Sequence, residues 1–147
     1  MSDGAAAHPC PRWTHFDHGA DIGIEGVGRT MEEAFSQAGI ALTAVITDPS
    51  TVRPLKRIDV ECRAPDPELL FVDWINALIF EMATRGMLFS RFEVRVSGEI
   101  LSGTAWGENL DRARHDRAVE VKGASYTELR VARGQDDCWH AACVVDV

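Results

Sequence analysis

Three carboxylates that flank apolar strands are the groups in this sequence best suited to chemistry. Asp21 opens the first patterned segment, whereas Asp146 and the α-carboxylate of Val147 close the last one. We expect the three groups to meet if the sheet places these two segments side by side. Clustered carboxylates repel one another unless a cation neutralises them, and Ca²⁺, Mg²⁺ and Mn²⁺ favour oxygen ligands. The pattern predicts a divalent-metal site; the alternative is that Asp21 is a turn residue and Asp146 a solvated strand end.

Thiols and imidazoles offer a second metal hypothesis. The cysteines are Cys10, Cys62, Cys138 and Cys143, and they include no CxxC pair. Because the chain begins without an export signal, we expect reduced thiols. A tetrahedral zinc site would draw on His15, His18, Cys138, His140 and Cys143. Against this hypothesis, Cys143 alternates with apolar neighbours and is better explained as a small core residue.

Other catalytic patterns are weaker. His18 could act as a general base oriented by Asp17 or Asp21, but a histidine in a turn is usually structural or solvated. The sequence contains no GxSxG, P-loop or dinucleotide fingerprint. A loose GxxGxG over residues 23–28 leads into Met31, which offers no phosphate ligand. Neither a serine hydrolase nor a nucleotide-binding protein is favoured.

The charge of the chain bears on its partners. Its formal net charge is −8, which argues against a protein that grips nucleic acid unaided, because phosphate affinity comes from clustered Lys and Arg. Only Lys56 and Lys122 are lysines, and the other basic residues are arginines. A lysine in such a background suggests a need for a compact ammonium. We expect Lys56 to be a solvated surface residue.

Length and composition predict one domain. A chain of 147 residues is long enough to bury a core without disulfides. We expect residues 1–11 to form a mobile tail and residues 12–147 to form a single domain. No apolar run approaches the roughly 18 residues needed to span a bilayer, and the first residues lack the features of a secretory signal. A cytoplasmic protein is therefore expected.

Hydrophobic periodicity predicts an α+β fold, a two-layer sandwich with two helices packed on one face of a largely antiparallel sheet. The helices are expected from Thr30 to Asp48, after a capping box of Thr30 and Glu33, and from Glu68 to Thr84. The expected strands cover residues 20–26, 56–63, 92–96, 100–106, 119–131 and 138–146, with a polar loop over 107–118. Asp73 stands out as a carboxylate in the second, largely apolar helix, although a solvated position there is equally plausible.

Several blocks together resemble the archease family. They are FDHGADIGIEGVGRTMEEAFSQAGIAL, LLFVDWINALIF, GMLFSRFEV, WGE with a following His115, VEVKGASYTELRV and the terminal VVDV. The blocks occur in the family's order from about Trp13 to Val147. The chain departs from the family pattern at Gly19, Gly123 and Val147, where Thr, Ala and Ile are usual. Of these three positions only Val147 is an expected metal ligand, and the change from Ile to Val leaves its α-carboxylate in place.

The resemblance implies a function and a set of residues. It implies a non-catalytic activator of the GTP-dependent tRNA-splicing RNA ligase, one that helps the ligase form its guanylate intermediate and turn over repeatedly. The implied metal ligands are Asp21, Asp146 and Val147. The residues implied in partner activation are Lys122, Asp17, His18 and Asp73. RNA would then be contacted only through the ligase, and no membrane is involved.

Two other functions stay open. One is a free-standing metal-dependent hydrolase of small phosphate esters, which would show turnover without any partner. The other is a chaperone-like binding module with no role for metal, which would bind a partner without affecting ligation.

Overall fold

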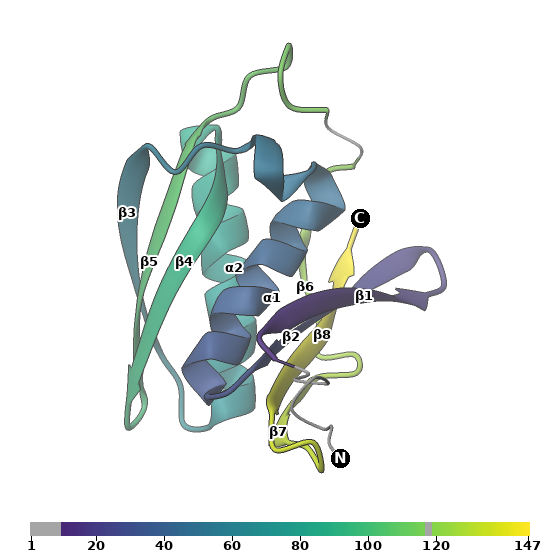
Figure 1. Cartoon of the computed structure of the whole chain (residues 1–147), viewed down its shortest axis with the longest axis vertical. Coiled ribbons are helices and arrows are strands. Elements are labelled where there is room, and N and C mark those ends of the chain that lie inside the picture. The colour runs from purple at the N-terminus through teal and green to yellow at the C-terminus, as the bar shows by residue number, and fades with distance from the viewer. Residues whose placement is uncertain (1–9, 117–118) are drawn as a thin grey trace, which may run out of the picture.

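Two antiparallel sheets and two long helices make up the protein in a computed structural model, which describes residues 10–116 and 119–147 (Figure 1). The larger sheet has the order β1-β2-β8-β6, with β7 also paired to β8. Its strands are β1 (Arg12–His18), β2 (Asp21–Gly28), β6 (Gly123–Ala124), β7 (Arg130–Arg133) and β8 (Trp139–Asp146). The smaller sheet has the order β3-β5-β4, formed by β3 (Lys56–Arg63), β4 (Met87–Ser97) and β5 (Ile100–Asn109).

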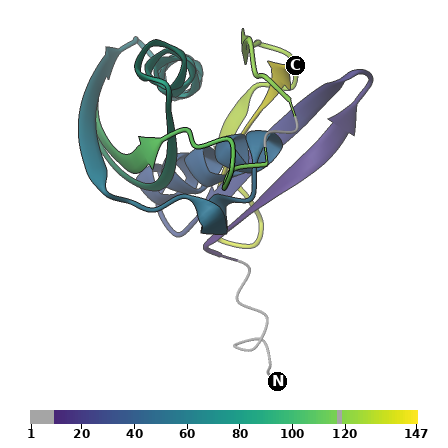
Figure 2. The same cartoon turned by 90° about the horizontal axis from the view of Figure 1, so that it is seen from above.

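The α+β class predicted from the sequence is confirmed, and the strands divide between two sheets rather than lying in a single one. Helix α1 (Met31–Ile46) packs against β2 of one sheet and β4 of the other, so it fills the space between them. Helix α2 (Pro67–Arg85) lies beside α1 and against the smaller sheet (Figure 2). A short 3-10 helix, η2 (Pro49–Thr51), follows α1.

The expected helix boundaries follow from capping. The Thr30 side chain accepts a hydrogen bond from the Glu33 N–H at 3.1 Å, and the Glu33 carboxylate in turn accepts from the Arg29 N–H at 2.8 Å. At the start of α2, the Asp66 side chain accepts from the Leu69 N–H at 2.9 Å. Gly86 ends α2 with φ of 62°, a left-handed conformation that glycine adopts without steric cost.

The core lies between the helices and the inner faces of the two sheets. Its largest fully buried side chain is Trp74 on α2, whose indole N–H donates to the Phe35 carbonyl at 3.0 Å. Gly103 on β5 allows this close packing, because a Cβ at that position would lie 2.3 Å from the Trp74 ring. The buried indole N–H thus has a hydrogen-bond partner, and Trp74 fixes α2, the helix that carries Asp73, against both α1 and β5.

Two expectations about strands were wrong. The segment 119–131 is not one strand, because within it only Gly123–Ala124 and Arg130–Arg133 pair with β8. Between these strands the chain turns outward at Tyr126, which is exposed. The polar loop also begins later than expected, since β5 continues to Asn109. Strand β1, which the sequence did not suggest, pairs with β2 along its whole length.

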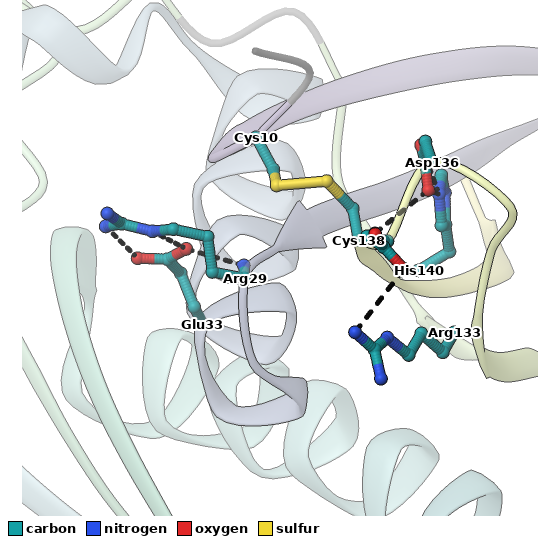
Figure 3. The surroundings of a disulfide bond; sticks show 8 residues. Cys10, Arg29, Glu33, Arg133, Asp136, Cys138 and His140 are labelled. Atoms are coloured by element: carbon teal, nitrogen blue, oxygen red, sulfur yellow. Dashed lines mark hydrogen bonds and ion pairs between the residues drawn. A yellow bond between two sulfur atoms is a disulfide. The ribbon is translucent and has the colours of Figure 1, made fainter. Parts of the chain in front are cut away.

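Cys10 and Cys138 form a disulfide, so the expectation of reduced thiols is wrong for this pair (Figure 3). The two cysteines are 128 positions apart in sequence, and only the tertiary fold brings their Cα atoms to 6.4 Å. They form a small buried cluster with Val27. Residues 1–9 of the expected tail lie outside the described residues.

Cys62 and Cys143 are free and buried. Burial raises the pKa of the Cys62 thiol to about 11 and that of Cys143 to about 12, which makes both unreactive at neutral pH. Cys143 is a core residue, as the alternating pattern indicated. In the described ranges, no helix is both long and apolar enough to cross a membrane.

Candidate functional site

The candidate carboxylates meet where β2 begins and β8 ends. These strands are antiparallel with Ile22 opposite Val145, so the next positions outward are Asp21 and Asp146. The Val147 N–H donates to Asp21 Oδ1 at 3.3 Å. Residues opposite each other on a ladder point to the same face, and Val145 faces the core. Asp21 and Asp146 therefore belong to the outer face of the sheet.

A tight hairpin delivers Asp21 to this position. His18 pairs directly with Asp21, which leaves Gly19 and Ala20 to make the turn between β1 and β2. Gly19 has φ of 62°, and this left-handed conformation gives a local reason for glycine at that point. His18 and Asp17 are both exposed at the end of β1. The pairing puts His18 on the same face of the sheet as Asp21.

Lys122 is held on the other side of β8. Its backbone N–H donates to the Asp146 carbonyl at 2.8 Å, and the following residue, Gly123, pairs with Asp146. Asn76 on α2 anchors this short strand, because its side-chain oxygen accepts from the Ala124 N–H at 2.9 Å. The Lys122 side chain is exposed. The fold thus places the exposed Lys122 beside Asp146, at the end of β8.

Asp73 is not drawn into this cluster by any contact in the described part of the chain. It is exposed on α2, and its charge acts on Cys62 of β3, where it adds to burial in raising the pKa of that thiol. Asp73 therefore lies toward the smaller sheet. Of the residues singled out from the sequence, Asp21, Asp146, Val147, Lys122 and His18 gather at one edge, with Asp17 adjacent and Asp73 apart.

The residues of the zinc hypothesis do not come together. Cys138 is in the disulfide and Cys143 is in the core. His15 Nε2 lies 2.8 Å from the Ala41 carbonyl, an arrangement in which the ring N–H donates. Among the residues that the structure describes, no three His, Cys, Asp or Glu side chains gather in a way that could hold a metal ion. The candidate site has two such side chains, Asp21 and Asp146, and its third donor would be a terminal carboxylate.

An ionic cluster centred on the buried Glu108, at the end of β5, was not recognised from the sequence. Glu108 is buried, and its carboxylate contacts Arg114 at 2.5 Å, Arg53 at 3.1 Å and His115 at 3.1 Å. Its pKa is held well below the ordinary value, mainly by the hydrogen bond from Arg114, with Arg53 and His115 adding to the effect. The sequence analysis placed Glu108 and His115 in a polar loop, because nothing in their spacing indicates that they are buried.

The proton on His115 follows from its neighbours. Nδ1 accepts from the Asp111 N–H at 2.9 Å, so Nε2 carries the proton and donates it to Glu108. Every polar atom of this imidazole is therefore satisfied within the protein, and the side chain is fully buried. The arrangement fastens the loop after β5 and leaves no open position for a substrate.

A second unpredicted cluster lies beside the disulfide (Figure 3). His140 places one ring nitrogen 3.3 Å from Glu25 and the other 3.0 Å from Asp136. Asp136 also accepts from the Cys138 N–H at 3.0 Å, so it supports the turn that carries the disulfide. Both histidine nitrogens are occupied by carboxylates, which makes this a structural contact of the β7–β8 turn.

Comparison with known proteins gives consistent matches. The profile of the Archease protein family matches residues 13–147. Protein archease of Pyrococcus furiosus is 34% identical over 140 residues, covering 92% of this chain and 99% of its own. Protein archease of Sulfurisphaera tokodaii is 38% identical over 122 residues, covering 82% of this chain and 88% of its own.

Two solved structures also match. The solution structure of protein 1598 of Methanobacterium thermoautotrophicum superimposes with a TM-score of 0.81 at 31% identity, over 94% of this chain and all of that one. The crystal structure of a Thermotoga maritima protein, described as "an archease, possible chaperone", has a TM-score of 0.54 at 18% identity, over 90% of this chain and 94% of that one. The second likeness concerns the fold alone.

Proposed function

This chain belongs to the archease family, and on that premise we propose that it activates a GTP-dependent tRNA-splicing RNA ligase. It would act as a protein cofactor that promotes guanylylation of the ligase and repeated turnover, without catalysing a reaction itself. The observation that supports this proposal best is the meeting of Asp21, Val147 and the backbone of Lys122 around the end of β8. These residues come from three separate parts of the sequence.

The oxygen atoms at this edge fit a hard divalent cation. Asp21 and Asp146 share a face, and the proposal takes the α-carboxylate of Val147 to be free as the third donor. All three are negatively charged oxygen donors, which suit Ca²⁺, Mg²⁺ or Mn²⁺ better than a thiophilic metal. A cation bound here would supply positive charge that can engage phosphate oxygens.

Lys122 would contribute a second positive charge beside the carboxylates. Its side chain is exposed, and hydrogen bonds to Asp146 and Asn76 fix the backbone at Lys122 and at Ala124, two residues further on. A compact ammonium interacts with a phosphate as a point charge. In this proposal Lys122 orients the triphosphate of GTP in the nucleotide site of the ligase while Asp21 and Asp146 hold the metal.

The charge of the chain favours such a partner. A net charge of −8 would attract a ligase whose RNA-binding surface is basic, and such complementarity mainly accelerates association. His18 and Asp17 are exposed at the tip of the β1–β2 hairpin, where they can reach a docked protein. We assign them, with Asp73, to contact with the ligase.

The decisive experiment measures ligase guanylylation. A substoichiometric amount of this protein is added to a cognate ligase with GTP and a divalent ion, and the covalent guanylate and the joined RNA are followed over time. We expect faster guanylylation and many turnovers, whereas the protein alone forms no guanylate and joins no RNA. Equal turnover with and without the protein, under limiting ligase, would contradict the proposal.

The same experiment separates the alternatives. Hydrolysis of generic phosphate esters by the purified protein, lost in Asp21→Ala, would indicate the metal-dependent hydrolase. Binding to the ligase that is independent of metal and without effect on guanylylation would indicate a chaperone-like module, the role suggested in the description of the Thermotoga maritima relative.

A further inference from the structure

The smaller sheet leaves one face open. Figure 2 shows α1 and α2 on one side of β3, β5 and β4, and no element in the described part of the chain covers the other side. This open face presents the alternate residues of each strand, of which Arg57, Trp106 and Arg91 form the first row. On this uncovered face an aromatic side chain lies between two cations, an arrangement that can stack a planar group and contact an anion.

The row is built by strand register and by a bulge. Trp106 on β5 pairs with Arg57 on β3 and with Arg91 on β4. The register of β4 shifts between Phe89 and Arg91, so that Ser90 is an extra residue. Without this bulge, Ser90 would lie opposite Trp106 and Arg91 would be displaced to the inner face. The bulge therefore selects a cation for the position beside the indole.

The ring positions the Arg91 guanidinium, whereas Arg57 is positioned mainly by Asp59. The Arg91 guanidinium carbon lies 4.6 Å from the centre of the Trp106 ring, and that of Arg57 lies 6.0 Å from it. Arg57 also donates from Nε to Asp59 at 3.1 Å, which leaves its terminal nitrogens available. Within the described residues, Arg91 forms no ion pair with a carboxylate. Its donors are thus ordered by a cation–π contact and remain free for an anion.

The charge of this face differs from that of the molecule. Its arginines, Arg57, Arg63, Arg91 and Arg95, outnumber its three carboxylates, although the chain as a whole carries −8. The carboxylates of Asp59, Glu61 and Glu93 line a hollow of about 430 Å³ in the middle of the sheet, together with Ser102 and Thr104. The Thr104 hydroxyl donates to Asp59 at 3.0 Å. The arginines at one end of the face can bind a phosphate, and the Trp106 ring beside them can stack a base. The carboxylates and hydroxyls that follow can accept hydrogen bonds from the hydroxyls of a ribose.

We propose that this open face binds a short segment of single-stranded RNA. One base stacks against the Trp106 and Arg91 pair, the adjoining phosphate contacts the terminal nitrogens of Arg57 and Arg91, and the ribose hydroxyls face the hollow. An acidic protein segment would satisfy the arginines but would leave the aromatic ring unused, so RNA is the better match. This contact would be direct, in contrast to the expectation that RNA is reached only through the ligase, and it does not depend on the proposed function.

The test uses the full chain alone, without ligase. The probe is a fluorescein-labelled single-stranded RNA of about ten nucleotides, within the usual range of single-strand site sizes. Binding is followed by fluorescence anisotropy at several salt concentrations. The variants are Trp106→Ala, Arg91→Gln and the matched control Arg63→Gln, which removes the same charge from the same face about 20 Å further along β3.

We expect Trp106→Ala to weaken RNA binding by at least about fivefold, the low end for removal of a base-stacking aromatic residue. Arg91→Gln should reduce the slope of log affinity against log salt by about 0.7, the value for one phosphate contact with a single strand. Arg63→Gln should leave both quantities unchanged. Circular dichroism and melting temperature verify that each variant is folded, as the outward position of all three side chains leads us to expect.

Several outcomes would overturn the proposal. Absence of RNA binding by the parent protein at low salt is one, and an equal effect of Arg91→Gln and Arg63→Gln is another. Tighter competition by poly-glutamate than by unlabelled RNA of the same length would assign the face to an acidic protein partner instead. Should Trp106→Ala fail to fold, Trp106→Phe and Arg91→Gln take its place in the test. Trp106→Phe retains an aromatic ring for stacking, so this variant should bind RNA nearly as well as the parent.

Discussion

Asp21 Oδ1 accepts a hydrogen bond from the backbone N–H of Val147 across 126 positions of sequence. This contact extends the pairing of β2 with β8 to the last residue of the chain. It also orients the Asp21 carboxylate toward the last residues of the chain. The proposed metal site depends on this relationship, because Asp21 and Asp146 alone would supply only two ligands.

Divalent cations should stabilise the folded protein. A ligand that binds only the folded state raises the free energy of unfolding by about 2.7 kcal/mol at one hundred times its dissociation constant. We expect Ca²⁺, Mg²⁺ or Mn²⁺ to raise the melting temperature of the parent but not that of Asp21→Ala. Glu61→Ala, which removes an exposed carboxylate from the other sheet, is the control. An undiminished response of Asp21→Ala would place the site elsewhere.

Extension of the chain beyond Val147 should abolish activation. A few glycine and serine residues added there convert the α-carboxylate to an amide and remove one negative oxygen donor from the proposed site. The measurement is ligase guanylylation in the presence of the extended protein. The control carries the same residues before Met1 and should retain full activity. If the two extended proteins are equally active, Val147 is not a ligand.

Lys122→Arg should impair activation although it keeps the positive charge. The guanidinium is broad and planar, whereas the proposed contact with phosphate needs a compact ammonium. We expect about a tenfold loss of stimulated guanylylation, equivalent to about 1.4 kcal/mol in the barrier. Lys56→Arg is the matched control, since Lys56 is the only other lysine and lies on β3. Full activity of Lys122→Arg would show that charge alone suffices.

The disulfide between Cys10 and Cys138 should contribute measurably to stability. Thiol titration of the unfolded parent should find only the two free cysteines, Cys62 and Cys143, before reduction. Removal of a native disulfide costs about 2–5 kcal/mol of unfolding free energy in small domains. A reductant should therefore lower the melting temperature of the parent. It should have no effect on a variant that combines Cys10→Ser with Cys138→Ser.

Glu108 should make stability sensitive to acid. Its pKa is lower in the folded protein than the ordinary value of 4.5, chiefly because Arg114 donates to its carboxylate. The stabilisation is thus fully present above about pH 4.5 and is lost as the pH falls toward the folded-state pKa. Glu108→Gln should cost about 1–3 kcal/mol at neutral pH, since the buried His115 N–H and the Arg53 and Arg114 donors lose a charged acceptor.

The dependence of stability on pH distinguishes the contribution of Glu108 from the general effect of acid on carboxylates. Unfolding free energy is measured by denaturant titration between neutral and acidic pH for the parent, for Glu108→Gln and for Glu61→Gln. The loss of stability on acidification should be smaller in Glu108→Gln than in the parent. Glu61→Gln, an exposed control on β3, should follow the parent. Parallel profiles for all three would show that Glu108 does not carry the acid sensitivity.

The sequence by itself determined those features that depend on neighbouring residues. The capping box at Thr30 marked the start of α1, because caps act within one turn. Asp66 and Gly86, which cap the two ends of α2, lie within two residues of the expected bounds of that helix. Alternation placed Ile24 and Cys143 in the core. The composition and the helix and strand order were enough for the α+β class. The family blocks pointed to Asp21 and Asp146 without any coordinates.

Tertiary structure decided what depends on residues far apart in the chain. The division into two sheets, the disulfide of Cys10 with Cys138 and the burial of Glu108 all join segments whose distance in sequence carries no local signal. The bulge that sets Arg91 beside Trp106 is likewise a matter of register between strands. Local propensities determine which elements form, whereas register and packing between elements determine which side chains meet.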